Sequence, residues 1–260
     1  MPPMVGGIFY EHGHRMVATF VGLLTTVLAV WMWRRDSRKW MRLLGLVALG
    51  MVITQGVLGG ITVIYLLPTP VSVSHATLAQ TFFCVTVLLA FATSREWNEA
   101  VARPDAETRS LRTAALVATL AIYLQLILGA VVRHTGSALA IPDFPLAFGG
   151  LIPPLTEASV VLHFVHRLGA LLVSASLAWL FVHTWKHVRD RRFRFPMIAL
   201  GCLVIVQILL GGTIVWTSRA VLPATAHVAT GALLLATTWL LTLRTYVHLE
   251  PPDDLPSHTL

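Results

Sequence analysis

Long apolar stretches alternate along this chain with short polar connections. Seven of the stretches are long enough to cross the roughly 30 Å hydrocarbon core of a bilayer as helices. They cover residues 14–33, 43–66, 71–93, 111–132, 159–185, 197–218 and 221–243. The pattern therefore predicts an all-α membrane protein with seven spans.

Composition agrees with this prediction. The chain is 56% hydrophobic and only 12% charged, whereas soluble domains are about a quarter charged. The first residues are poor in basic side chains and include two prolines, so no cleavable signal peptide is expected. Cys84 and Cys202 lie inside apolar spans without a disulfide or metal-binding pattern, and we expect both to be buried small residues.

The net charge of +7 is distributed unevenly. Basic residues gather in three alternate connections, at 34–42, 95–112 and 186–194, and the connections between them hold few. By the positive-inside rule, the basic connections and the C-terminus lie in the cytoplasm and the N-terminus lies outside. This distribution argues for a multi-pass protein of a bacterial-type cytoplasmic membrane, in contact with lipid, and against binding of nucleic acid.

An internal repeat organises the chain. The segments "HRMVATFVGLL", "QGVLGGITVIY" and "HATLAQTFFC" in the first half begin at residues 14, 55 and 75. The segments "HRLGALLVSAS", "QILLGGTIVWT" and "HVATGALLLA" follow them at a constant offset of 152 residues. A constant register over three spans indicates a duplicated bundle, with the two copies related by a pseudo-two-fold axis along the membrane normal.

The span at 111–132 precedes the second copy and has no counterpart in the first. It carries Gln-x-x-x-Gly at 125–129, as do the spans at 55–59 and 207–211. We therefore expect two pseudo-symmetric bundles, with 3+4 spans in this chain and 4+4 in the complete arrangement, whose first helix would precede residue 1. The N-terminal half should cover residues 1–110 and the C-terminal half residues 111–260.

Four histidines occupy equivalent repeat positions near the outer ends of their spans: His14, His75, His166 and His227. Imidazole is a good iron ligand, and a four-helix bundle can hold a haem between facing side chains. A single such histidine is more often an interfacial residue satisfied by backbone or water. Four in one register within membrane segments favour haem ligation instead, in the pairs His14 with His75 and His166 with His227.

Other residues near these positions allow two interpretations. Arg15 and Arg167 follow a histidine directly, where they could contact haem propionates or anchor the helix at the interface. The glycine pairs 59–60 and 211–212 could admit a macrocycle or simply allow close helix packing.

Glu11 breaks the symmetry of the repeat. It lies three residues before His14, so the two share a helix face, whereas the equivalent position in the second copy is His163. A carboxylate beside a haem could act as a general base, and a glutamate that merely begins a helix is the alternative. His12 falls off this face and fits a residue at the helix start.

At these positions the whole chain resembles the heme A synthase family of membrane enzymes. The specific parts are Glu11-x-x-His14-Arg15, the stretch "VRHTGSALAIPDFPLAFG" at 131–149, His166-Arg167, His75 and His227. The resemblance implies two four-helix bundles and oxidation of the C8 methyl group of haem o to a formyl group, which gives haem a for terminal oxidases.

The resemblance also implies roles for individual residues. His14 and His75 would flank the substrate haem, His166 and His227 would ligate haem b for electron transfer, and Glu11 would be catalytic. Haem o is then the substrate, haem o synthase a candidate partner, and the electron donor is not identified. Some relatives carry cysteine pairs in the outer loops, where this chain has Ile141 and Ala147, so a disulfide is absent from this loop.

Two other functions fit the histidines alone. One is a non-enzymatic dihaem b-type electron carrier, and the other is a membrane protein that binds or transfers haem. A carboxylate in one half only favours the enzyme, because an electron carrier has no need of it.

Overall fold

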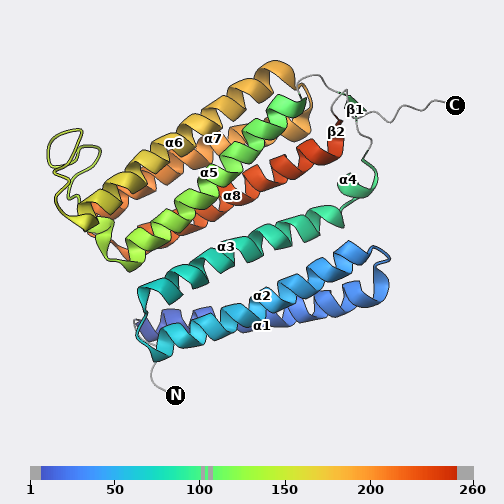
Figure 1. Ribbon diagram of the computed structural model, residues 1–260, viewed down its shortest axis with the longest axis horizontal. Helices are drawn as coiled ribbons and strands as arrows, with labels where there is room; N and C mark the ends of the chain where they lie inside the picture. The colour runs from blue at the N-terminus through green and yellow to red at the C-terminus, as the bar shows by residue number, and fades with distance from the viewer. Residues whose placement is uncertain (1–6, 101–102, 105–107, 251–260) are drawn as a thin grey trace. The chain divides into compact units, whose positions relative to one another are not determined.

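The computed structural model describes residues 7–100, 103–104 and 108–250, and nearly all of them are helical (Figure 1). Seven helices are long and apolar enough to cross a membrane, as the sequence predicts. They are α1 (Gly7–Arg35), α2 (Lys39–Ile64), α3 (Thr69–Ala92), α5 (Thr108–His134), α6 (Ala158–His187), α7 (Arg191–Trp216) and α8 (Val221–His248). Each contains most or all of one predicted span.

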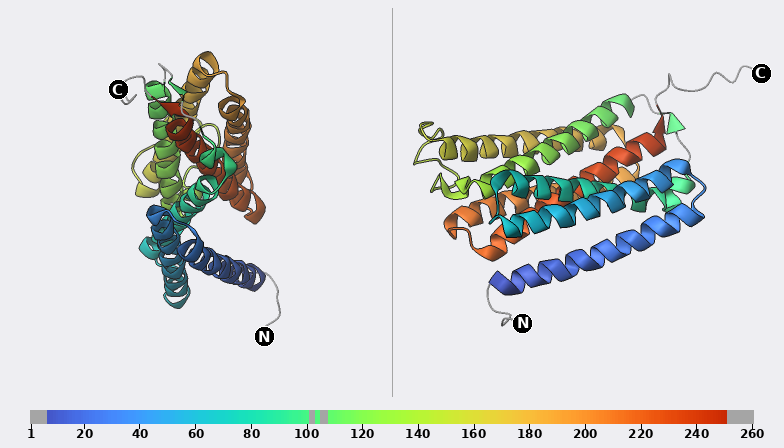
Figure 2. Two further views of the ribbon diagram at one scale, coloured as in Figure 1. Left: turned by 90° about the vertical axis from the view of Figure 1, so that its right-hand side faces the viewer. Right: turned by 60° about the horizontal axis from the view of Figure 1, so that its bottom comes forward.

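The chain divides into two compact units, Met1–Leu89 and Ala90–Leu260. In the N-terminal unit, α1 packs along α2, and α3 follows. In the C-terminal unit, α5 packs against both α6 and α8, and α7 packs against α8 and α6, which closes a four-helix bundle (Figures 1 and 2). The C-terminal unit thus has the four-helix form that the sequence predicts for it.

The boundary between the units lies about twenty residues before the expected one, which was 110/111. The reason is the segment after α3. The short helix α4 (Arg95–Asn98) and the two-residue strand β1 (Arg103–Pro104) both join the C-terminal unit, β1 by pairing with β2 (Leu249–Glu250). This connection therefore belongs structurally to the second bundle.

The repeat extends to backbone conformation. The residues after α2, Leu66 and Leu67, have φ angles of 54° and 61°, and the residues after α7, Ser218 and Arg219, have 49° and 70°. These pairs are 152 residues apart, and the left-handed region is disfavoured for side chains of this size. In both copies the second residue of the pair donates its N–H at 2.8 Å to a carbonyl of the preceding helix. Both copies thus reverse the chain by the same turn.

Ionic contacts fix the end of the C-terminal unit that lies away from His166 and His227. Glu96 on α4 receives two hydrogen bonds from Arg244 at 2.8 and 2.9 Å, and His248 lies 3.1 Å from the same carboxylate. Pro196 has no N–H for the carbonyl of Arg192 one turn earlier, and Arg244 donates to that carbonyl at 2.9 Å. A single arginine therefore joins α4, α7 and α8.

One sequence expectation is wrong. Cys202 is exposed, and Cys84 is only partly buried. The outer surface of a membrane bundle faces lipid and is itself apolar, so an apolar neighbourhood in the sequence does not imply burial in the protein.

Candidate functional site

His14 and His75 come together near the starts of α1 and α3. Their ring centroids are 6.5 Å apart, and the ring planes meet at 73°. Helices α1 and α3 run in the same direction because α2 returns the chain between them, so histidines early in both helices lie at one end of the unit. The structure thus brings these two residues together, and their ligation of a haem stays a prediction.

Helix α2 supplies the neighbours of His75. The amide nitrogen of Gln55 donates to the backbone carbonyl of His75 at 3.1 Å. One turn further along α2, a Cβ added to Gly59 would lie 3.4 Å from Cε1 of the His75 ring. The glutamine thus holds the backbone of the histidine, and the glycine leaves room for its ring.

The same arrangement recurs around His166 in the C-terminal unit. The amide nitrogen of Gln125 on α5 donates to the His166 carbonyl at 2.7 Å and lies 3.0 Å from Nδ1 of its ring. A Cβ on Gly129 would lie 3.1 Å from Cε1 of that ring. A Cβ on Gly169 of α6 would lie 2.1 Å from Oε1 of Gln125, so each helix has a glycine where the other inserts a polar side chain.

His227 on α8 has equivalent neighbours on α7. The amide nitrogen of Gln207 lies 3.3 Å from Nε2 of His227, and a Cβ on Gly211 would lie 3.5 Å from Cε1. Both histidines lie on helices of the same four-helix bundle. That they form a haem-binding pair stays a prediction.

Unsatisfied polar atoms gather at these positions. Four side-chain atoms there are buried without a hydrogen-bond partner: Oε1 of Gln55, Nδ1 of His75, Oε1 of Gln207 and Nδ1 of His227. Buried polar atoms are nearly always paired, and exceptions point to a missing ligand or ion. Imidazole pairs with small residues beside them are a donor set that suits haem iron, so the residues present fit a haem in each unit.

The counterpart of Glu11 has a different role in the C-terminal unit. His163 is buried, and its Nδ1 lies 3.3 Å from the N–H of Ile141, while its Nε2 lies 3.4 Å from Nε of Arg167. A neutral imidazole accepts a hydrogen bond at only one ring nitrogen, so in either tautomer only one of these two contacts is a hydrogen bond. His163 thus anchors the connection between α5 and α6.

Arg167 also binds this connection, residues 135–157. Its guanidinium donates to the carbonyls of Leu146 at 2.8 Å and Asp143 at 2.7 Å. The Asp143 carboxylate accepts from the N–H groups of Phe148 and Gly149, both at 2.7 Å. These hydrogen bonds hold the pKa of the Asp143 carboxyl below its ordinary value, and the bond from Gly149 has the largest effect. The loop is therefore fixed from within and from α6.

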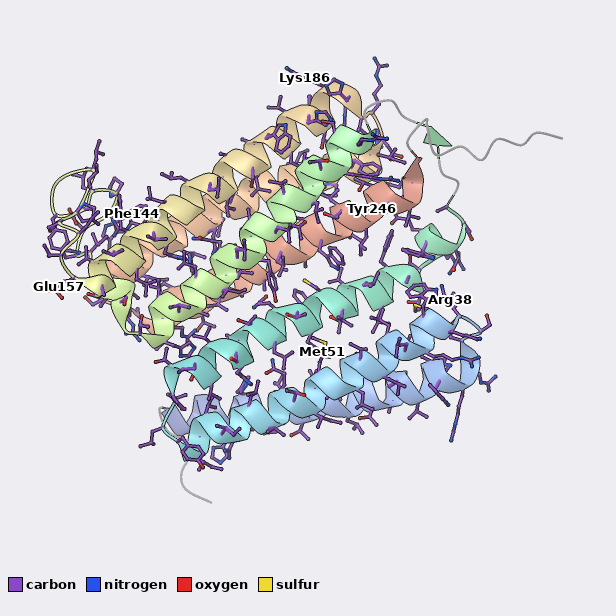
Figure 3. All side chains as sticks on the ribbon, viewed as in Figure 1. Arg38, Met51, Phe144, Glu157, Lys186 and Tyr246 are labelled. Atoms are coloured by element: carbon purple, nitrogen blue, oxygen red, sulfur yellow. The ribbon has the colours of Figure 1, made fainter. Side chains whose placement is uncertain are left out.

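Phe144 seats the same loop on α7. It lies at the end of the C-terminal unit marked by Glu157 in Figure 3, opposite Lys186 and Tyr246. Its ring packs edge-on against Trp216 with centroids 5.9 Å apart, and a Cβ on Gly212 would approach the ring to 2.8 Å. The two glycines of the 211–212 pair thus serve different contacts, one with His227 and the other with Phe144.

An apolar contact lies within the loop between α5 and α6. Ile141 and Ala147, with 0% and 3% of their surface exposed, belong to one cluster with Val160. Burial of this cluster thus holds the loop in its folded-back conformation.

The other predicted site residues are placed as follows. Glu11 belongs to the backbone of α1, but its side chain lies outside the described part of the structure. Arg15 is exposed on α1. Contact of Arg15 or Arg167 with a propionate stays a prediction. The role of the glutamines was not foreseen, although the repeated Gln-x-x-x-Gly pattern was visible.

Comparison with known proteins places this arrangement in context. The family model described as cytochrome oxidase assembly protein matches residues 6–239. The chain is 28% identical over 214 residues to the heme A synthase of Shouchella clausii, which covers 82% of this chain and 71% of that relative. It is 34% identical over 177 residues to the heme A synthase of Symbiobacterium thermophilum, covering 66% and 58%. For the heme A synthase of Halalkalibacterium halodurans the identity is 29% over 234 residues, covering 87% and 76%.

Proposed function

Because the chain belongs to the family of cytochrome oxidase assembly proteins, we propose that it is a heme A synthase, which oxidises the C8 methyl group of haem o to a formyl group. Its similarity to heme A synthases over most of its length supports this assignment. The enzyme is then an oxidoreductase of haem a biosynthesis.

The observation that carries the proposal is the difference between the two histidine pairs. Position 163 holds a buried imidazole that is committed to the outer loop through Ile141 and Arg167. Its counterpart Glu11 lies one helical turn before His14. A carboxylate thus accompanies one pair only, which suits a substrate site in the N-terminal unit and an electron-transfer site in the C-terminal unit.

The residues then divide the chemistry between the units. His14 and His75 would hold the substrate haem, and Glu11 would serve as a general base near the methyl group that is oxidised. His166 and His227 hold haem b, which supplies a one-electron redox centre when bound. The loop fixed by Arg167 and Phe144 covers the bundle that holds this second pair.

The seven spans and the charge distribution indicate how the protein is oriented in the membrane. Two of the helices that carry a candidate histidine near their start end in basic residues: α1 ends in Arg34 and Arg35, and α6 ends with Lys186 in its last turn. By the positive-inside rule, we place these basic ends and the C-terminus in the cytoplasm and both haem sites toward the outer face. Haem o, haem o synthase and an electron donor are the partners that the proposal requires.

Analysis of the bound pigments tests the proposal. The purified chain from a host that makes haem o should release haem b together with haem o or haem a on acid extraction and chromatography. Haem b alone, at two per chain, would instead identify a dihaem electron carrier.

A further inference from the structure

Three of the four histidines face a glutamine and a glycine spaced four residues apart on the neighbouring helix. The sets are Gln55 and Gly59 for His75, Gln125 and Gly129 for His166, and Gln207 and Gly211 for His227. Residues four apart lie on one helix face, so each set presents an amide and a gap to the same imidazole. We propose that Gln125 and Gly129 are positioning residues for His166, and that the two other sets act in the same way. This inference rests on the proposed haem b site in the C-terminal unit.

Helices α5 and α6 fit closely together around His166. Two contacts fix the Gln125 amide on His166, at the backbone carbonyl and at Nδ1. The absence of a side chain at Gly169 provides the space for this amide, because a Cβ there would lie 2.1 Å from Oε1 of Gln125. Gly129 provides the space for the ring in the opposite direction. The helices interlock at the histidine, which restricts the ring to one orientation.

Gln125 also bears on which nitrogen of the His166 ring carries the proton. A histidine that binds iron through Nε2 carries its proton on Nδ1 and donates it to a neighbouring acceptor, which orients the ring and raises its basicity. Gln125 already contacts Nδ1 and leaves Nε2 without a glutamine contact. To accept the Nδ1 proton, the terminal amide must make a half-turn that brings Oε1 to the ring, and its hydrogen bond to the His166 carbonyl is then given up.

The other sets differ in detail. Oε1 of Gln55 and Oε1 of Gln207 are buried without a partner, as are Nδ1 of His75 and Nδ1 of His227. One set in each unit thus contains both an unused amide acceptor and an unused ring nitrogen. In His227 the amide contacts Nε2, the usual iron-binding nitrogen, so ligation there replaces this contact.

The reduction potential of haem b in the full chain tests the inference. Gln125→Leu removes the acceptor for the Nδ1 proton, so the ligand becomes less basic and the potential should rise while haem b stays bound. Gln125→Glu supplies a stronger, charged acceptor, and the potential should fall. Gln80→Leu is the matched control, because Gln80 lies on α3 outside the three sets, and it should leave the potential unchanged. Equal potentials in all of these proteins would overturn the inference.

Glycine variants test the same inference without changing the glutamine. Gly129→Ala should lower the amount of haem b per chain severalfold, because its Cβ would lie 3.1 Å from Cε1 of His166. Gly201→Ala on α7 is the control, since a Cβ there meets nothing within 4 Å. Circular dichroism and gel filtration show whether Gln125→Leu folds. If it does not, the comparison of Gly129→Ala with Gly201→Ala is the test of the inference. Equal haem b content in these two variants would refute the role of Gly129. A wild-type chain without haem b would contradict the proposed function itself. A chain with haem b that makes no haem a would contradict the enzyme but not the positioning role.

Discussion

The imidazole rings of His14 and His75 lie edge to face near the starts of α1 and α3, with their centroids 6.5 Å apart. On α2, Gln55 donates to the His75 carbonyl, and Gly59 leaves room for the His75 ring. His14, the member of the pair on α1, lies about one helical turn after Glu11. These relationships define the substrate site that we propose for the N-terminal unit.

Replacement of His75 by alanine should weaken the binding of haem o roughly tenfold or more, because the substrate loses one of two facing imidazoles. Haem b should remain, since both of its proposed ligands lie in the C-terminal unit. Absorbance titration of the purified protein with haem o measures both quantities. His12→Ala is the control on α1, two residues from His14, and equal weakening by the two variants would contradict the assignment.

The loop between α5 and α6 should depend on Ile141. Ile141→Ala removes a side chain that is 0% exposed and should cost about 2 to 4 kcal/mol of local stability. Backbone amides of residues 135–157 should then exchange hydrogen for deuterium faster, as measured by mass spectrometry. Leu151→Ala provides a comparison within the same loop, because Leu151 is 84% exposed. The prediction fails if both variants exchange at the wild-type rate.

The contact of Glu96 with Arg244 and His248 should make stability depend on pH. Burial raises the pKa of Glu96, but the hydrogen bonds from these partners outweigh it and hold the pKa below the ordinary value of 4.5. A lowered carboxylate pKa stabilises the fold above about pH 4.5, and this stability is lost as the pH falls through the folded-state pKa.

Glu96→Gln should therefore lower the free energy of unfolding at pH 7 by about 1 to 2 kcal/mol. The difference from wild type should shrink below pH 4.5, the ordinary value for this group. Thermal unfolding in detergent, followed by circular dichroism, measures the effect. Glu99→Gln, an exposed neighbour, should have no such effect, and a difference that stayed constant with pH would count against the contact.

The helices and the histidine pairs could be predicted from the sequence for clear reasons. Lipid requires long uninterrupted apolar segments, and the constant offset of 152 residues carries the relation between the copies. The Gln-x-x-x-Gly pattern was equally visible, but its purpose was not, because spacing along one helix does not tell which helix it faces.

The loop contacts could not be predicted for a similar reason. From the sequence, His163 is interpreted as replacing a carboxylate and Arg167 as a propionate ligand. In the structure both bind loop backbone that lies 21 to 24 residues away in the chain. The burial of Ile141 with Ala147 likewise depends on how the loop folds back. Burial of Cys202 was predicted wrongly because apolar residues on a membrane bundle face lipid as readily as they face the core.

The central claim is that the two units divide the reaction, and haem extracted from cells that express single variants tests it most directly. Glu11→Ala should lower the ratio of haem a to haem o by about 100-fold or more while the haem b spectrum is retained. His166→Ala should remove the haem b spectrum and haem a formation together, and Glu157→Ala, another glutamate at the start of a helix, should change neither. Haem a formation at the wild-type rate in the Glu11→Ala protein would contradict the account.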